Sequence, residues 1–302
     1  MSRVYVAPIS FGLGDLVVSL PAVQALIDET DRNGGETWLV ARSPAQAALA
    51  GRIAGLAGTV GDDAFARDGS DGRFVDLRDH PLQTDHWWGS AEFEAAFGPM
   101  SINEILARIC ADFGIAADFM RPHPLTARPR PEISSWVVLV ADSDGPSKRW
   151  PVERWVALAD AIRDRGLDVR ALTRGDDAGK LGAAGIEAAP APTPGDAVDV
   201  LNAARAVIGV DTGPTHIAAQ QGTPTITICR ASAVFFRPWP HTRAVAGAPC
   251  AESCAAVEAD YAYNERVDLR GFEWQPRDCP VGSRCLDAVR PEDVMQALGQ
   301  LL

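Results

Sequence analysis

Residues 209–224 read GVDTGPTHIAAQQGTP and overlap the end of an apolar run, residues 203–210. The apolar run predicts a buried strand, and Pro214 opens a predicted helix over 215–221, at a position that tolerates its missing N–H. Gly222 and Pro224 end that helix. The free N–H groups and positive dipole end of a helix that starts beyond a parallel strand favour an anion. The segment therefore predicts a strand, a turn and a helix with an anion site at the turn.

Polar residues crowd this turn, where Thr212 and His216 can add hydrogen bonds to a phosphate. Most such turns in doubly wound folds hold no ligand, so the turn alone leaves a structural role open. Residues 211–228, DTGPTHIAAQQGTPTITI, resemble the donor-site signature of glycosyltransferase family 9, the bacterial heptosyltransferases. The resemblance implies that the nucleotide diphosphate of an activated sugar is held by Asp211, Thr212, Gly213, Pro214 and His216.

The composition is that of an ordinary globular protein. The chain has 302 residues, 47% of them hydrophobic and 23% charged, which suits two domains with separate cores. Its net charge of −12 disfavours nucleic acid and anionic membrane surfaces, because both attract basic proteins. A lipid-linked acceptor is disfavoured for the same reason.

The amino terminus predicts a strand over 3–9, a loop over 10–14, and a helix whose apolar residues fall on one face. Asp15 interrupts the apolar stretch, so we do not expect a signal peptide, and no run of 18 apolar residues predicts a membrane span. We expect a cytoplasmic protein. The loop lacks the third glycine and the spacing of a dinucleotide fingerprint, which excludes a classical NAD site.

Residues 9–26, ISFGLGDLVVSLPAVQAL, resemble the amino-terminal signature of the same family, in which a Gly-Asp pair precedes a helix with a Leu-Pro. The resemblance implies that Asp15 is the catalytic base and that Gly14 belongs to the donor site. A carboxylate at the carboxyl end of a strand can accept a hydroxyl proton in an interdomain cleft. The structural alternative is that Asp15 caps the helix, and one residue can do both.

Residues 142–155, DSDGPSKRWPVERW, form a Gly-Pro loop between a predicted strand and helix, where Ser143 and Lys148 could cradle a phosphate. Solvated Lys-Arg pairs are common in loops. The loop resembles the family's Lys-x-Trp-Pro element, which implies that Lys148 is the charge partner of the departing diphosphate and Ser143 a hydroxyl donor to it. Trp150 and Pro151 are expected to pack the loop.

Residues 79–93, DHPLQTDHWWGSAEF, place His86, Trp87 and Trp88 in a polar, turn-rich segment. Flat aromatic faces there could bind an acceptor sugar, whereas the structural alternative is that the tryptophans fill a core.

Four cysteines fall in the carboxyl-terminal segment 250–285 with the spacing C-x3-C-x24-C-x5-C. These residues, Cys250, Cys254, Cys279 and Cys285, could bind structural zinc or iron, or remain free buried thiols. Disulfides are disfavoured by the expected cytoplasmic location. In the autotransporter heptosyltransferases, a branch of the family that modifies proteins, a comparable quartet holds iron, and residues 79–90 also resemble that branch more than the lipopolysaccharide enzymes. A thiolate-saturated metal leaves no open position for catalysis, so no catalytic cofactor is expected.

The remaining pattern alternates strands and helices on both sides of a proline-rich segment, residues 121–135. This alternation predicts an α/β protein with two doubly wound, Rossmann-like domains facing a cleft, residues 1–128 and 129–302. The family resemblance gives this arrangement its name, GT-B. Further strands are predicted over 37–41, 73–77, 136–141 and 168–173, and further helices over 43–53, 101–113, 152–165, 195–204 and 291–302.

The resemblance implies an inverting glycosyltransferase that moves heptose from ADP-heptose to an acceptor hydroxyl on a protein or soluble small molecule, without a divalent metal. One alternative is a GT-B transferase that uses another nucleotide-sugar on a natural product. A second is a non-catalytic nucleotide-sugar-binding protein. The sequence does not indicate the oligomeric state, the base of the donor nucleotide or the acceptor.

Overall fold

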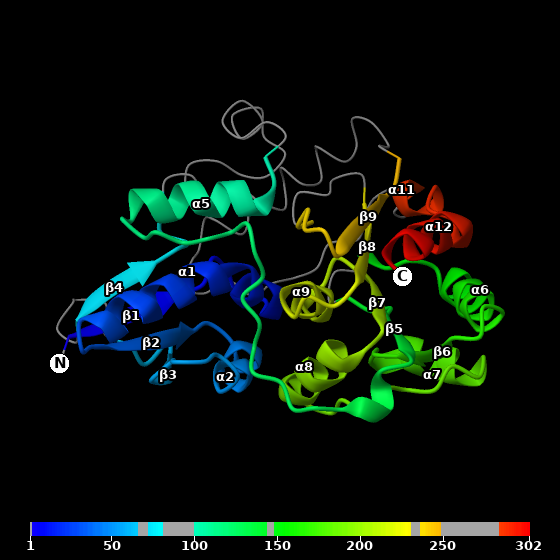
Figure 1. Ribbon diagram of the computed structural model, residues 1–302, viewed down its shortest axis with the longest axis horizontal. Coiled ribbons are helices and arrows are strands. Elements are labelled where there is room, and N and C mark those ends of the chain that lie inside the picture. The colour runs from blue at the N-terminus through cyan, green and yellow to red at the C-terminus, as the bar shows by residue number, and fades with distance from the viewer. Residues whose placement is uncertain (1, 66–71, 81–99, 144–147, 231–235, 249–283) are drawn as a thin grey trace.

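The computed structural model describes residues 2–65, 72–80, 100–143, 148–230, 236–248 and 284–302. Within them, two all-parallel sheets lie side by side, with helices between and around them (Figure 1). The predicted α/β class is confirmed. No helix of these described ranges has the length and apolar character of a membrane span.

The first sheet has the strand order β3-β2-β1-β4. Its strands are β1 (Arg3–Ala7), β2 (Glu36–Ala41), β3 (Gly58–Gly61) and β4 (Arg73–Asp76), and its helices are α1 (Leu13–Arg32), α2 (Pro44–Ala50) and α5 (Ile102–Asp112). Three of these strands match the predicted ones. The fourth, β3, was not predicted, because it has only four residues, GTVG, and two of them are glycines. It forms an edge by pairing with β2 alone.

The second sheet has the order β6-β5-β7-β8-β9. Its strands are β5 (Trp136–Val140), β6 (Asp168–Ala171), β7 (Ala206–Val210), β8 (Thr225–Cys229) and β9 (Thr242–Ala246). The helices of this half are the 3-10 turn η1 (Pro131–Ile133), α6 (Val152–Arg163), α7 (Gly175–Ala183), α8 (Pro194–Ala203), α9 (Gly213–Gln220), α11 (Arg284–Asp287) and α12 (Pro291–Leu301). The predicted division after residue 128 falls between α5 and β5, and it stays a prediction.

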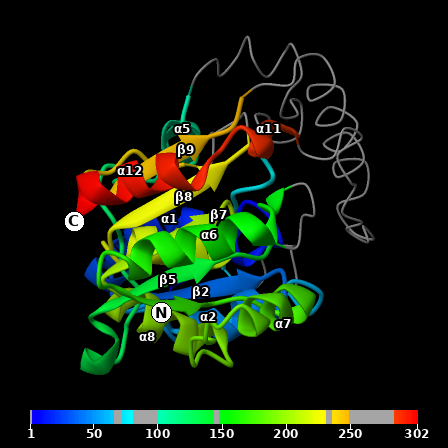
Figure 2. The same ribbon diagram turned by 90° about the vertical axis from the view of Figure 1, so that its right-hand side faces the viewer.

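The three central strands of the second sheet, β5, β7 and β8, are buried on both faces, which is why they form continuous apolar runs in the sequence. In β5 the side chains alternate between two apolar clusters. Val138 and Val140 face the first domain, whereas Val137 and Leu139 face the outer helices. Figure 2 shows α6 and α12 on that outer side, and Figure 1 shows α8 and α9 on the opposite face.

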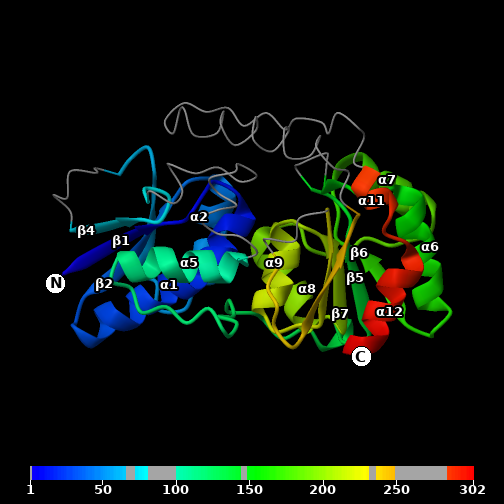
Figure 3. The ribbon, with the colours of Figure 1, turned by 90° about the horizontal axis from the view of Figure 1, so that it is seen from above.

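The apolar cluster between the sheets belongs to both domains. It includes Leu16 and Val17 of α1 together with Ile217 and Ala218 of α9, all fully buried. Figure 3 shows these two helices meeting at the middle of the molecule, with α5 beside α1. The expectation of two separate cores is therefore wrong in part, because the two domains share one core in addition to the cluster on the far side of the second sheet.

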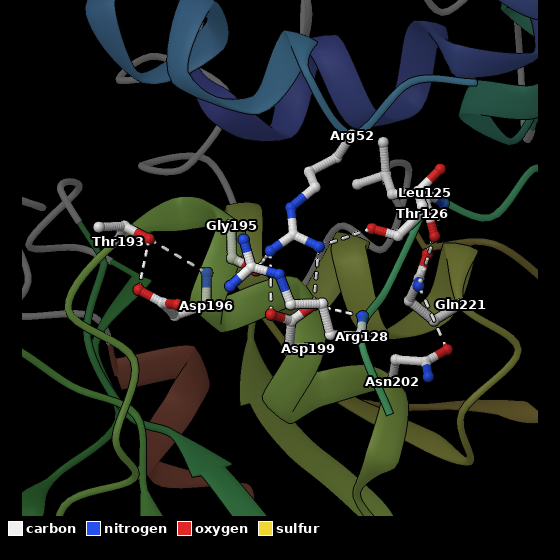
Figure 4. Close-up of polar contacts among 10 residues, drawn as sticks. All are labelled: Arg52, Leu125, Thr126, Arg128, Thr193, Gly195, Asp196, Asp199, Asn202 and Gln221. Atoms are coloured by element: carbon white, nitrogen blue, oxygen red, sulfur yellow. Dashed lines mark hydrogen bonds and ion pairs between the residues drawn. The ribbon is translucent and has the colours of Figure 1, made fainter. Parts of the chain in front are cut away.

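A second contact between the domains is ionic (Figure 4). The guanidinium of Arg52, just beyond α2, donates to both carboxylate oxygens of Asp199 in α8, at 2.8 and 2.9 Å. The same guanidinium donates to the carbonyls of Gly195 and Thr126, each at 2.9 Å, and the Arg128 N–H donates to Asp199 at 2.7 Å. Since Asp199 is 2% exposed, this bidentate pair fixes α2, α8 and the connecting segment together in a dry environment.

Candidate functional site

The turn after β7 lies at the carboxyl edge of the second sheet, where β7 neighbours β5. Thr212 has an extended backbone and begins α9 as its N-cap, and Pro214 occupies the first turn. The predicted strand, turn and helix are confirmed. The N–H groups of this first turn are free of intrahelical partners by the geometry of a helix, so they provide donors for an anion.

At this turn the Asp211 carboxylate contacts the side chains of Lys148 and His216. One carboxylate oxygen accepts from Nζ of Lys148 at 2.8 Å, and the other lies 3.0 Å from Nε2 of His216. Burial by itself raises the pKa of Asp211, but the charge of Lys148 and the hydrogen bond from His216 outweigh it and hold the pKa well below its ordinary value. The carboxylate stays ionised and orients Lys148 and His216. It is unsuited to bind a diphosphate directly, because like charges repel.

The amino termini of α1 and α9 approach each other closely through two glycines. A Cβ placed on Gly14 would lie 3.0 Å from Cδ2 of His216, and one placed on Gly213 would lie 3.0 Å from Cβ of Leu13. Glycine at both positions lets the two helix ends come this near without displacing a neighbour. The residue that follows Gly14 is Asp15, so the predicted base lies beside the predicted donor site.

Asp15 caps its own helix. Its Oδ2 accepts from the backbone N–H of the N-cap residue Gly12 at 2.8 Å, and because glycine has no side chain, no reciprocal bond completes a capping box. Gln46 of α2, fully buried, braces the same loop by donating from Nε2 to the carbonyls of Ser10 and Gly12 at 2.8 and 2.9 Å. The capping alternative is thus observed, and the role of Asp15 as a base stays a prediction.

The Lys148 loop is partly described. Ser143, just beyond β5, is 5% exposed, and its carbonyl accepts from Nε of Arg149 at 3.0 Å. Trp150 is buried against the edge of Trp155, with 5.0 Å between ring centroids, and its indole N–H donates to the carbonyl of Val289 at 3.2 Å. The expected packing role of Trp150 is confirmed.

Several predicted site residues lie outside the described ranges, namely His86, Trp87, Trp88, Cys250, Cys254 and Cys279. The fourth candidate metal ligand, Cys285, is buried in α11. Among the described residues, no group of three or more His, Cys, Asp or Glu side chains could hold a metal. Burial raises the pKa of both Cys110 in α5 and Cys229 in β8 to about 12, which makes these two thiols unreactive near neutral pH.

Two arginines at the carboxyl edge of the first sheet were not predicted. Arg42 follows β2 and pairs with Asp76, while Arg78 follows β4 and donates to Oγ of Ser10 at 2.9 Å. Both guanidinium groups lie over the ring of Phe11, at 5.9 and 4.9 Å from its centroid. The sequence signal for these two residues was an arginine directly after each of the strands predicted over 37–41 and 73–77. These contacts stiffen the loop between β1 and α1.

The chain resembles known glycosyltransferases in sequence and in fold. Residues 106–261, just over half of the chain, match the model of glycosyltransferase family 9 (heptosyltransferase). Lipopolysaccharide heptosyltransferase 1 of Pseudomonas aeruginosa is 34% identical over 100 residues, which are 31% of this chain and span only 28% of that relative.

Several solved structures share the fold, among them two from E. coli. The heptosyltransferase WaaC of E. coli, solved with ADP, superimposes with a TM-score of 0.66 at 15% identity, covering 99% of this chain and 100% of WaaC. The iron-containing dodecameric glycosyltransferase TibC of enterotoxigenic E. coli gives 0.62 at 15% identity, covering 99% of this chain and 76% of TibC. At this identity the similarity establishes the two-domain architecture of the heptosyltransferases, and the family model establishes the lineage. The chain belongs to glycosyltransferase family 9.

Proposed function

We propose that this protein is an inverting glycosyltransferase that moves heptose from ADP-heptose to an acceptor hydroxyl. The observation that carries the proposal is the Asp211 carboxylate, which holds Lys148 and His216 beside the first turn of α9. A lysine, an imidazole and a helix amino terminus then lie together, which is a combination that suits a nucleotide diphosphate. Among proteins of this fold, WaaC is known in complex with ADP and TibC in complex with ADP-heptose.

In the proposed reaction, Asp15 accepts the proton of the acceptor hydroxyl as its oxygen attacks the anomeric carbon. The bond from that carbon to the diphosphate breaks, and its electron pair leaves on the diphosphate oxygen. Lys148, Thr212, His216 and the N–H groups of α9 interact more strongly with this oxygen as its charge grows, which lowers the barrier. Attack from the face opposite the leaving group inverts the anomeric configuration.

The acceptor is proposed to be a protein hydroxyl or a soluble small molecule. The net charge of −12 supports this choice over an anionic lipid surface. We also propose that the chain lies nearer to the protein-modifying branch of the family, because of its cysteine quartet and the sequence of residues 79–90. The fold similarity does not separate the branches, since WaaC and TibC give similar TM-scores.

A structural metal is part of the same proposal. The donor set of Cys250, Cys254, Cys279 and Cys285 consists of four thiolates, which suits iron or zinc in a closed tetrahedral site. Such a metal would stabilise the carboxyl-terminal segment and supply no step of the transfer. Metal analysis of the purified protein, with Cys285→Ser as the comparison, tests this point; a metal content that the substitution leaves unchanged would contradict it.

The donor assignment is tested by calorimetric titration with ADP, GDP, UDP and dTDP. We expect selective binding of ADP that weakens about a hundredfold in Lys148→Met, since a charge-assisted contact to a phosphate is lost. Lys180, the other lysine of the chain, forms a surface pair with Asp177 in α7, so Lys180→Met is the matched control. Selective binding of another nucleotide would favour the alternative of a different nucleotide-sugar donor.

The base assignment is tested with Asp15→Asn. An asparagine oxygen can still accept from the Gly12 N–H, so the helix cap survives while the base is removed. We expect transfer to fall at least about a hundredfold, with ADP affinity and the thermal midpoint nearly unchanged. Normal transfer in this variant would remove Asp15 from the mechanism, and ADP binding without transfer to any acceptor in the wild type would favour the non-catalytic alternative.

A further inference from the structure

Pro21 leaves a gap in the hydrogen bonding of α1. It lies in the middle of the helix and is buried, and proline has no N–H for the carbonyl four residues earlier. That carbonyl belongs to Val17, which is completely buried, so water cannot supply a donor in its place. A buried carbonyl without a donor costs free energy, and a replacement is therefore required.

Gln220 supplies the donor from the other domain. This side chain of α9 is completely buried, and its Nε2 donates to the Val17 carbonyl at 3.0 Å. Its Oε1 accepts from the backbone N–H of His123 at 2.9 Å. A backbone carbonyl only accepts and a backbone N–H only donates, so these two partners fix the orientation of the amide. A buried glutamine in this apolar cluster is stable because both of its ends are paired.

The contact gives the two helices a second fixed point. The first is the close approach of Gly14 and Gly213, and the second lies further along both helices. The glycine contact alone would let the helices turn about their crossing point. The hydrogen bond from Gln220 restricts this rotation and also restricts sliding of one helix along the other. The side chains at the two helix starts are then held in one mutual arrangement.

We infer that Gln220 is a positioning residue for sugar transfer. Its hydrogen bond to the Val17 carbonyl, which has no helical donor because of Pro21, holds Asp15 in a fixed position relative to Asp211 and His216. This inference rests on the proposed function for the role of Asp15. The hydrogen bond between the domains does not depend on that proposal. Gln220 itself touches no reacting atom.

The link between Pro21 and Gln220 is tested by a double-mutant cycle with Gln220→Met, Pro21→Ala and the combination. Methionine keeps the length of the side chain and removes its hydrogen bonds, while the Pro21→Ala substitution restores a backbone N–H donor for the Val17 carbonyl. The loss of the His123 bond is common to both backgrounds and cancels in the cycle.

Gln221, the next residue in the sequence, provides a matched control. Its amide bonds both the N–H and the carbonyl of Leu125 and the side chain of Asn202, and these partners all lie outside α1 (Figure 4). Gln221→Met therefore removes hydrogen bonds of the same kind without affecting the contact between α1 and α9.

We expect Gln220→Met to lower the thermal midpoint by about 5 °C in the otherwise wild-type chain and by about half as much in the Pro21→Ala background. Gln221→Met should lower the thermal midpoint by the same amount in the wild-type and Pro21→Ala backgrounds. Equal losses for Gln220→Met in the two backgrounds would overturn the coupling, because Val17 would then not depend on Gln220 for a donor.

The positioning role is tested by release of ADP from ADP-heptose, with an identified acceptor or with water. We expect kcat to fall about tenfold in Gln220→Met while KM for ADP-heptose stays within about twofold, since misplacement of the base leaves donor binding intact. An unchanged kcat, or an equal fall in Gln221→Met, would overturn this role. If the wild type releases no ADP, the proposed function and the positioning role fail together, and the midpoint cycle still decides the hydrogen bond.

Discussion

Two of the contacts between the domains differ in chemistry. At Arg52 and Asp199 the domains are joined by a bidentate ion pair whose remaining donors and acceptors bind backbone groups. At α1 and α9 they are joined by apolar packing, the approach of two glycines and the hydrogen bond from Gln220. The ionic contact holds the connecting segment, whereas the helical contact lies beside the candidate site. Loss of the ionic contact is therefore expected to affect stability with little effect on the site, whereas changes in the helical contact should also affect the geometry of the site.

The largest expected effect comes from Arg52→Met, which leaves the Asp199 carboxylate buried without its partner. Breaking one side of a buried pair costs about 3–5 kcal/mol, so the thermal midpoint should fall by about 10 °C. Calorimetry measures the midpoint, and ADP titration should show little change in affinity. Arg121→Met, which breaks an exposed pair with Asp118, is the control and should have almost no effect. Equal midpoints for the two variants would mean that the ionic contact does not hold the domains.

The same contact predicts a dependence on pH. Burial raises the pKa of Asp199, but hydrogen bonds from Arg52 and from the Arg128 N–H outweigh it, so the folded-state pKa lies below the unfolded value. Its stabilisation is present above the unfolded pKa, about 3.9, and is lost as pH falls through the folded value. The midpoint difference between wild type and Arg52→Met should therefore become smaller as the pH falls below about 3.9. A constant difference would contradict this assignment.

The helical contact predicts a smaller effect with the opposite signature. In Gly14→Ala the new methyl group would lie 3.0 Å from Cδ2 of His216, so the imidazole must shift by a few tenths of an ångström. We expect ADP release from ADP-heptose to slow about tenfold, with a midpoint change of about 1 °C. Gly51→Ala is the control, because no heavy atom of the described residues lies within 4 Å of that Cβ. Normal turnover in Gly14→Ala would show that the position of the His216 ring does not matter for the reaction.

Local signals predicted most elements around the site. Pro214 and Gly222 delimit α9, and the apolar runs of β5 and β7 are continuous because both faces of the second sheet are covered. The adjacency of Lys148 and Asp211 follows from the same logic, since the carboxyl ends of parallel strands meet at one edge.

The contacts between the domains had no such signal. Asp199 reads as an ordinary charge on an amphipathic helix, and Arg52 lies 147 positions away from it in the sequence. Gln220 reads as a polar residue near a helix end, and only the three-dimensional fold places it opposite the carbonyl that Pro21 leaves. Pairings of this kind depend on how two sheets dock, which composition and periodicity do not encode.

The apolar cluster common to both domains affects how the chain folds as it is synthesised. Translation delivers α1 first, yet the residues that cover its inner face, such as Ile217 and Ala218, emerge about two hundred positions later. During that interval the nascent first domain presents Leu16 and its neighbours to solvent, a surface that molecular chaperones recognise. Ribosome-bound chains that end before α9 should therefore remain sensitive to protease, and resistance should appear only after α9 has left the exit tunnel.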